Sequence, residues 1–142
     1  MSEFDVDEFL ARPLTARVAT DGPTVRPTWY LWEDGAFWIL SGSWSRLPER
    51  VRARSRLALT VDICELDTGL VRQVVASGTA ELRTFDVPRG RRKLVRYLGD
   101  DEERWDPRFR AYLHDDPGTV WVHLRPTRLV AKDLSYDVPR TP

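Results

Sequence analysis

Runs of β-branched and aromatic residues recur along this chain, and short turn sequences containing Asp, Gly or Pro separate them. Such runs are typical of β-strands, and an Asp-Gly pair between two runs supplies the positive φ angles of a tight hairpin turn. Asp34-Gly35 has this placement, and residues 21–23 and 67–69 are further turns of this kind. The predicted strands are residues 14–20, 25–32, 37–40, 57–63, 70–84, 119–124 and 129–131.

Between these strands, apolar residues recur at helical spacing. Leu47 and Val51 are four residues apart, and Arg46, Arg50 and Arg54 form a second stripe with the same spacing. This pattern predicts a short helix that starts at residue 45 or 48, with its apolar stripe on the sheet and its arginines toward a ligand or water. The other predicted helical segments are residues 4–11, 87–98 and, less regular, 100–113.

Hairpin connections predict a mostly antiparallel sheet, and short strands at this density favour a small barrel with helices at its ends or sides. We expect about six strands. Gly78, inside the longest predicted strand, indicates a bulge or the close approach of another backbone. The 142 residues, 42% of them hydrophobic, suffice for one domain covering residues 1–142, with an N-terminal helical segment at 1–13 and a flexible tail at 137–142.

Charge and rare residue types restrict the possible functions. Lys plus Arg and Asp plus Glu balance at 22 each, which argues against a nucleic-acid or membrane partner, although the arginines of residues 46–56 beside Trp44 would suit a single strand. Cys64 is the single cysteine, and the two histidines lack the spacing of metal ligands. Neither a nucleophile elbow nor a dinucleotide-binding glycine turn is present.

With no signal sequence and no apolar run of membrane-spanning length, we expect a cytoplasmic protein.

The segment from Ser41 to Arg46 places small hydrogen-bonding residues directly before the arginine-bearing helix. A helix N-terminus offers unpaired amide donors and the positive end of a dipole, and the guanidinium groups of Arg46 and Arg50 add charge. The sequence therefore predicts a phosphate site here, which is the first indication of a cofactor.

Three local motifs resemble those of the pyridoxamine 5′-phosphate oxidase-like flavin-binding split-barrel superfamily. The oxidase strand motif Arg-x-Val-Leu-Leu-Lys corresponds to Arg-Pro-Thr-Trp-Tyr-Leu at residues 26–31. A Ser or Thr closing the next strand, followed by Ser-Arg-Lys at a helix start, corresponds to Ser41 and to Ser-Arg-Leu at residues 45–47. The most specific motif is Arg-Gln-Val at residues 72–74, followed by Gly78.

The resemblance covers roughly residues 14–134 and implies a mainly β fold with flanking helices, a six-stranded antiparallel split β-barrel that binds FMN. The glutamine of the third motif hydrogen-bonds the flavin in relatives. The residues that the resemblance implies as cofactor contacts are Arg26, Ser41, Ser45, Arg46 and Gln73, with Thr28, Trp29 and Tyr30 as strand positions against the ring system. Arg50 is added from helix geometry, because it lies one turn after Arg46.

The chain also departs from the oxidase pattern. Leu31 and Leu47 replace the lysines that end the first and second motifs. Residues 129–136 lack the C-terminal Trp and Arg-x-His features that hold pyridoxal substrate, so vitamin B6 oxidation is not expected. Actinobacterial relatives include enzymes that use the deazaflavin coenzyme F-420 on the same barrel, and the high arginine content keeps this cofactor as an alternative.

Two functions follow from this resemblance. The first is an oxidoreductase that transfers hydride between FMN or coenzyme F-420 and a small organic substrate. The alternative is a module without turnover that binds flavin, haem or another flat molecule for sensing, storage or transfer. We expect a homodimer, because the relatives place the cofactor across a two-fold interface and because six tryptophans, unless they are ordinary core and rim, need a partner or a ligand to cover them.

Overall fold

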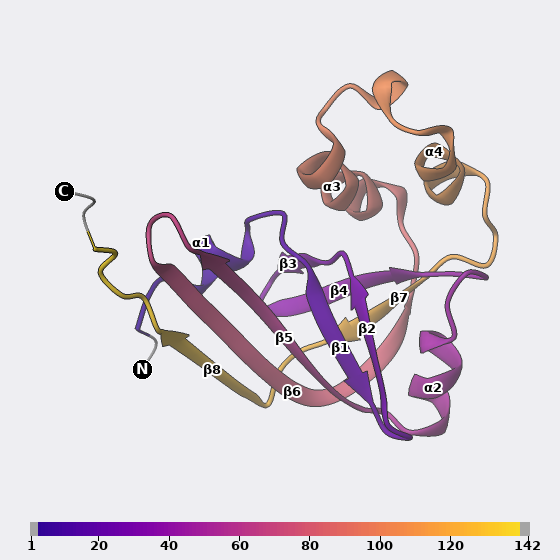
Figure 1. Cartoon of the computed structure of the whole chain (residues 1–142). Helices are drawn as coiled ribbons and strands as arrows, with labels where there is room; N and C mark the ends of the chain where they lie inside the picture. The colour runs from indigo at the N-terminus through magenta and orange to yellow at the C-terminus, as the bar shows by residue number, and fades with distance from the viewer. Residues whose placement is uncertain (1–2, 140–142) are drawn as a thin grey trace.

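Eight strands form an antiparallel sheet in the order β2-β1-β5-β6-β7-β4-β3, and β8 pairs with β6 (Figure 1). The structure is a computed structural model that describes residues 3–139. The strands are β1 Ala16–Thr20, β2 Thr24–Thr28, β3 Leu31–Glu33, β4 Ala36–Ser41, β5 Arg56–Glu65, β6 Leu70–Thr84, β7 Val120–Leu124 and β8 Arg128–Asp133. The helices are α1 Val6–Leu10, α2 Leu47–Ala53, α3 Val87–Leu98 and α4 Pro107–His114, with a 3-10 turn at Glu102–Arg104.

β6 belongs to both halves of the sheet. Its residues 70–79 pair with β5, residues 72–77 also pair with β8, and residues 80–84 pair with β7. Gly78 lies where the pairing changes from β8 to β7, and a Cβ there would be 3.1 Å from the backbone nitrogen of Thr127. The predicted close approach of another backbone is therefore confirmed. β2 and β3 end the strand order, so within the described residues the barrel is split rather than closed.

The interior of the curved sheet is filled by every second residue of its strands. In β5 these are Leu57, Leu59, Val61 and Ile63, which are buried while the residues between them face outward. α1 adds Phe9 and Leu10 to the same core. Alternation with period two thus separates a packed inner face from an outer face along β1, β5 and β6.

α3 and α4 pack against each other beside β4 and β7 (Figure 1). Trp38 of β4 and Trp121 of β7 are buried on this side of the sheet, where Phe85 and Tyr112 pack against them. The helical pair therefore covers a second apolar surface, separate from the barrel interior.

The predicted split barrel with flanking helices is confirmed, but it has eight strands rather than about six. The segment 25–32, predicted as one strand, is divided into β2 and β3 because the chain turns at Trp29 and Tyr30. The backbone N–H of Tyr30 donates to the hydroxyl of Tyr97 on α3 rather than to a neighbouring strand. Residues 137–139 of the predicted tail have no regular secondary structure, and residues 140–142 lie outside the described part.

The hairpin predicted at Asp34-Gly35 is confirmed. Glu33 pairs with Ala36 across a two-residue loop, and both loop residues have positive φ angles, 56° for Asp34 and 70° for Gly35. This turn brings the short strand β3 back along β4 and fixes the register of the pair.

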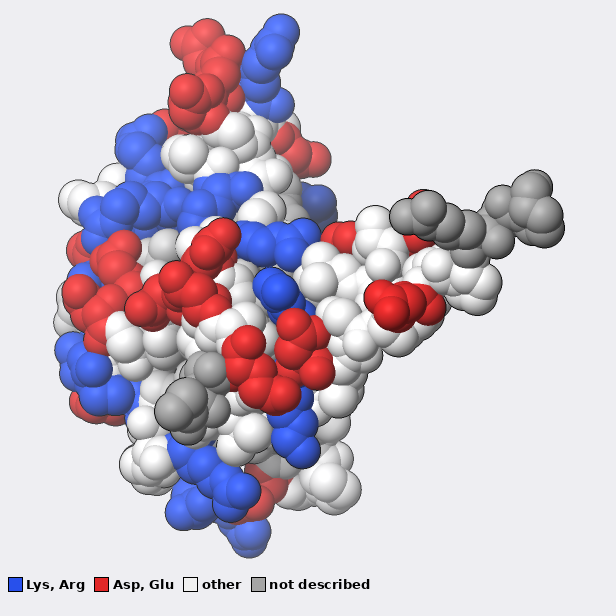
Figure 2. All heavy atoms as spheres, turned by 90° about the vertical axis from the view of Figure 1, so that its left-hand side faces the viewer, with Lys and Arg blue, Asp and Glu red and all other residues white. Residues whose placement is uncertain are grey.

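Basic and acidic side chains share the face of the molecule shown in Figure 2, and neither sign covers it alone. This mixture agrees with the equal numbers of positive and negative residues in the chain. A search of the described helices finds none with both the length and the apolar character needed to cross a membrane.

Candidate functional site

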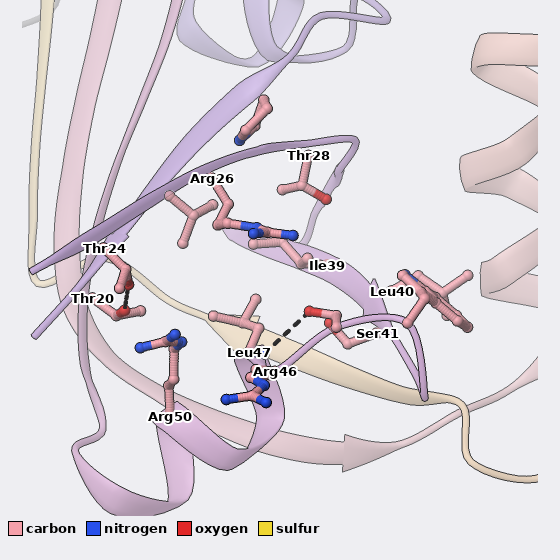
Figure 3. A pocket seen from close by; sticks show the side chains of 14 residues that line it. Thr20, Thr24, Arg26, Thr28, Ile39, Leu40, Ser41, Arg46, Leu47 and Arg50 are labelled. Atoms are coloured by element: carbon pink, nitrogen blue, oxygen red, sulfur yellow. Dashed lines mark hydrogen bonds between the residues drawn. The ribbon is translucent and has the colours of Figure 1, made fainter. Parts of the chain in front are cut away.

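A pocket of about 370 Å³ lies between the β1–β2 hairpin, β4 and the start of α2 (Figure 3). This volume is within the range of small-molecule sites. The pocket is lined by Val18, Thr20, Thr24, Arg26, Pro27, Thr28, Ile39, Leu40, Ser41, Trp44, Ser45, Arg46, Leu47 and Arg50.

The register of the first hairpin explains the polar wall of this pocket. Thr20 pairs with Thr24, and Val18 pairs with Arg26, so Arg26 points to the same face of the sheet as the inner residues of β1. The hydroxyls of Thr20 and Thr24 are hydrogen-bonded to each other. The edge strand β2 thus places the guanidinium group of Arg26 over the open end of the barrel.

α2 supplies the opposite wall. Val51 is buried against the barrel, and Arg46 and Arg50 lie one turn apart on the side that lines the pocket. In Figure 3, Arg26 reaches in from one wall, and Arg46 and Arg50 reach in from the other. The predicted division of this helix is confirmed for Val51 on the core side and for Arg46 and Arg50 on the pocket side. Arg54, predicted in the same stripe, lies beyond the end of α2 and does not line the pocket.

The start of α2 differs from the expected set of free amide donors. The N–H of Leu47 donates to the hydroxyl of Ser45 at 3.1 Å, and the N–H of Ser45 donates to the carbonyl of Gly42 at 3.0 Å. Pro48 has no N–H to offer. Fewer helix-start amides are therefore free than expected, and guanidinium and hydroxyl groups add donors to the pocket.

The pocket carries excess positive charge. Its lining contains three arginines and no Asp or Glu. Among residues 3–139, the guanidinium groups of Arg26, Arg46 and Arg50 form no ion pair with a carboxylate. Guanidinium groups bind phosphate and carboxylate oxygens strongly, so this arrangement is suited to an anionic ligand.

Ser41 adds a buried polar group to the same pocket. It is 1% exposed, and no hydrogen-bond partner of its hydroxyl is found in the described part of the chain. The hydroxyl is open to the pocket rather than enclosed by protein atoms. The free hydroxyl of Ser41 is therefore available to a molecule bound in the pocket.

Six of the nine residues expected to contact a cofactor lie together in this pocket: Arg26, Thr28, Ser41, Ser45, Arg46 and Arg50. Trp29 and Tyr30 do not line it, and their expected strand positions are wrong because both lie between β2 and β3. Trp29 stacks on Tyr97, with ring centroids 4.3 Å apart. Tyr30 is fully buried, and burial raises the pKa of its hydroxyl.

Gln73 lies outside the pocket of the single chain. It pairs with Asp62 of β5 and Lys132 of β8, and it alternates with the buried Val74. Its side chain is therefore on the outer face of the sheet, opposite to the barrel interior.

Thr20, Thr24 and Trp44 also line the pocket, although none of them was expected to contact a cofactor and Trp44 was named only for the alternative of single-strand binding. The two threonines could have been found from the alternation of side chains along a strand. Thr20 lies two positions from Val18, and Thr24 lies two positions from Arg26, so each shares the inward face with that residue. Trp44 lies in the loop between β4 and α2, where no periodic pattern predicts the direction of a side chain.

No protein-family model matches this sequence, and no curated protein is similar to it. Solved structures with a similar fold are found. A conserved hypothetical protein from Mycobacterium tuberculosis, Rv2991, superimposes with a TM-score of 0.71 at 23% identity, over 94% of this chain and 85% of that protein. An FAD-binding protein from Mesorhizobium loti gives a TM-score of 0.65 at 20% identity, over 95% and 96% of the two chains.

An F-420 reductase superimposes with a TM-score of 0.61 at 22% identity, over 87% of this chain and 94% of that protein. At these identities the similarity establishes the fold. The resemblance derived from the three sequence motifs is thus confirmed at the level of architecture: the chain has the split-barrel fold of these solved structures.

Proposed function

We propose that this protein is a flavin-type oxidoreductase that binds FMN, or coenzyme F-420 in its place, and transfers hydride to or from a small organic molecule. The observation that carries this proposal is the pocket with three arginines free of carboxylate partners in the described chain, beside an apolar wall. A flat heterocycle with an anionic tail has the matching chemistry, and solved proteins of this fold include FAD-binding and F-420 proteins.

The residues that line the pocket fit a flavin or deazaflavin with an anionic tail. Arg46 and Arg50 would hold the anionic tail, and the hydroxyls of Thr24 and Ser41 would donate hydrogen bonds to it or to the adjoining chain. Ile39 contributes apolar surface to the same pocket. The flavin or deazaflavin would supply the hydride chemistry, while the protein would orient the ring and exclude water from one of its sides.

An alternative function is binding without turnover, for sensing, storage or transfer of a flavin, haem or another flat molecule. One observation favours it: the residues that line the pocket include no His, Asp, Glu, Tyr, Cys or Lys, so arginine is the only titratable type present. A reaction that needs a general acid or base would have to obtain it from the substrate, from water or from a second chain.

The proposal includes a homodimer. The outer face of β1, β5 and β6 carries Ala19, Ala58, Thr60 and Val75 in adjoining positions, and Val75 is 44% exposed. Arg17 and Asp62 form an ion pair on the same face, next to these small side chains. A small uncharged patch bordered by charged groups suits contact with a second copy. Gln73 lies on this same face, and we propose that in the dimer it contacts a cofactor bound in the pocket of the other copy.

We place the reaction in the cytoplasm. Support comes from the single cysteine, Cys64, which is exposed and unpaired, as is usual in a reducing compartment. Nucleic acid and membranes are not among the partners that we propose.

Native mass spectrometry with FMN and with coenzyme F-420 tests the proposal, because it reports the mass of the assembly and the number of bound ligands together. We expect a dimer that binds one of the two cofactors. The double variant Arg46→Met/Arg50→Met should lose binding, whereas Arg52→Met, on the exposed side of the same helix, should retain it. A wild-type protein that binds neither cofactor would refute the proposed function.

Reduction of the bound cofactor by a nicotinamide donor, followed by oxidation by candidate acceptors, separates the two functions. Turnover supports the oxidoreductase. Tight binding of the cofactor with no turnover under any of these conditions supports the binding module.

A further inference from the structure

Trp44 lies at the edge of the pocket, in the loop between β4 and α2. It is 41% exposed, whereas Trp38, Trp105 and Trp121 are at most 5% exposed. An exposed indole is unfavourable unless a partner or ligand covers it. Its position beside the pocket makes a bound ligand the nearest candidate.

One face of the indole is already supported by the helical pair. Trp44 stacks on Tyr112 of α4, with ring centroids 4.3 Å apart and an interplanar angle of 30°. Tyr112 in turn contacts Phe109 edge to face, at 5.9 Å between centroids. This support restricts the orientation of the indole before any ligand arrives.

The loop is built so that the indole can lie against the backbone. A Cβ on Gly42 would be 2.7 Å from Cη2 of Trp44 and still closer to Cζ3. The glycine is therefore required for space. Any larger residue at position 42 would force the indole away from its position at the pocket.

The indole N–H of Trp44 also differs from those of the buried tryptophans. Trp38 donates to the carbonyl of Glu33 at 3.1 Å, and Trp105 donates to the carbonyl of Gly99 at 2.9 Å. Trp121 donates to a carboxylate oxygen of Asp86 at 3.3 Å. For Trp44, no acceptor is found among residues 3–139, so its N–H is available to a ligand.

The pocket has two chemically different ends. Thr20, Thr24 and Arg50 lie together at one end of the view in Figure 3, and Leu40 lies at the other. Tyr112, the stacking partner of Trp44, packs against the apolar cluster that contains Leu40. The indole of Trp44 therefore lies at the apolar end of the pocket, away from Thr20 and Thr24.

We propose that Trp44 contacts the planar ring of the ligand, by stacking on it, while Arg46 and Arg50 hold the anionic tail. This inference rests on the proposed function, since it assumes that a flavin-type ligand occupies the pocket. It makes Trp44 the residue that sets affinity for the ring, independently of the charge on the tail.

FMN and riboflavin differ only in the phosphate, so binding of both, measured by calorimetry and by flavin fluorescence, tests the inference. Trp44→Leu should weaken both ligands by the same factor, about tenfold, because stacking on an aromatic side chain contributes about 1–3 kcal/mol. Trp44→Phe should largely restore binding, because it keeps a stacking ring. Arg46→Met/Arg50→Met should weaken FMN and leave riboflavin unchanged.

Gly42→Ala provides a second variant that leaves the indole intact but displaces it, and it should behave like Trp44→Leu. Circular dichroism and thermal unfolding would verify that each variant is folded. Equal affinity of wild type and Trp44→Leu for both ligands would overturn the role of Trp44 while leaving the proposed function intact. A loss for FMN alone would also overturn it. A wild-type protein that binds no flavin and no coenzyme F-420 would overturn the proposed function together with this inference.

Discussion

The guanidinium of Arg96 on α3 donates a hydrogen bond of 2.6 Å to the carbonyl of Tyr30, at the point where the chain leaves β2 and enters β3. The same side chain donates to the carbonyls of Leu10, the last residue of α1, and of Ala11 and Arg12, which follow it. One cation therefore joins the N-terminal helix, the break between two strands and the helical pair. The carbonyl of Arg12 also accepts from the N–H of Leu14, and that of Tyr30 also accepts from the hydroxyl of Tyr97, so Arg96 adds a charged donor to carbonyls that lie outside the sheet ladder.

Replacing Arg96 should destabilise the whole fold. We expect Arg96→Met to lower the free energy of unfolding by about 2–4 kcal/mol, because several charge-assisted hydrogen bonds to backbone carbonyls are lost at once. Arg91→Met, on the same helix, removes only an exposed ion pair with Glu102 and should have a much smaller effect. Urea denaturation of both variants measures the difference, and equal midpoints would contradict this role of Arg96.

This contact also explains where the sequence failed to predict the fold. Residues 25–32 are rich in β-branched and aromatic residues, and local pattern alone predicts one strand there. The strand ends at Thr28 because side chains from residues 96 and 97, far along the chain, bind the backbone of Tyr30. Such long-range contacts leave no local signal. In contrast, α3 begins and ends as its own periodicity predicts, at Val87–Leu98.

The residues of the candidate site likewise include some that the sequence predicts and some that it does not. Arg46 and Arg50 could be predicted because helical spacing alone puts them on one side of α2. Trp44 could not, because its direction depends on the space left by Gly42 and on a stack with Tyr112, which is distant in sequence. The position of Gln73 outside the pocket could not be predicted either, because it depends on which face of β6 turns toward the barrel interior.

Ligand binding in the pocket should depend on salt. Three arginines without carboxylate partners in residues 3–139 attract an anionic ligand electrostatically, and added salt screens this attraction where the pocket opens to solvent. We expect the affinity for FMN to fall between low and high ionic strength, with little change for uncharged riboflavin. Arg26→Met should reduce the salt dependence, because one of the three charges is lost. Titrations at several salt concentrations check this, and identical salt responses of the two ligands would argue against an electrostatic role.

Lys93 of α3 should make the stability of the protein depend on pH, independently of the pocket. It is 6% exposed, its ammonium lies 5.8 Å from the ring centroid of Trp29, and burial lowers its pKa to about 7. Between about pH 7 and its ordinary value of 10.5, the unfolded chain binds this proton more strongly than the folded protein, so stability should rise with pH in this window. Lys93→Met should therefore stabilise the protein at pH 7, on the order of 3 kcal/mol, and by less at pH near 10.

Lys132→Met is the matched control for this prediction. Lys132 is the other lysine of the chain and is exposed on β8, so the same substitution should leave the pH dependence of unfolding unchanged. Thermal unfolding of both variants at a series of pH values makes the comparison. A stabilisation by Lys93→Met that does not change with pH would indicate better packing rather than removal of a buried charge.

His123 of β7 should make the protein sensitive to acid. It is 2% exposed, its ring lies 4.5 Å from that of Trp38, and neither ring nitrogen has a hydrogen-bond partner in the described chain. Burial, reinforced by Arg83, lowers the pKa of this imidazole below its ordinary value of 6.5. Below about pH 6.5 the unfolded chain therefore takes up a proton more readily than the folded protein, so stability should fall as the pH decreases through this region.

His123→Leu should flatten this acid dependence. At neutral pH the variant should be as stable as the wild type or slightly more stable, by about 1 kcal/mol, because two buried nitrogens without partners are replaced by apolar surface. His114→Gln alters the other histidine, which is exposed and bonded to Glu102, and it should leave the contribution of His123 in place. Denaturant unfolding from neutral to mildly acidic pH measures the slopes. A wild-type slope retained by both His123→Leu and His114→Gln would contradict the role of His123 and assign the acid sensitivity to carboxylates, since no other histidine is present in the chain.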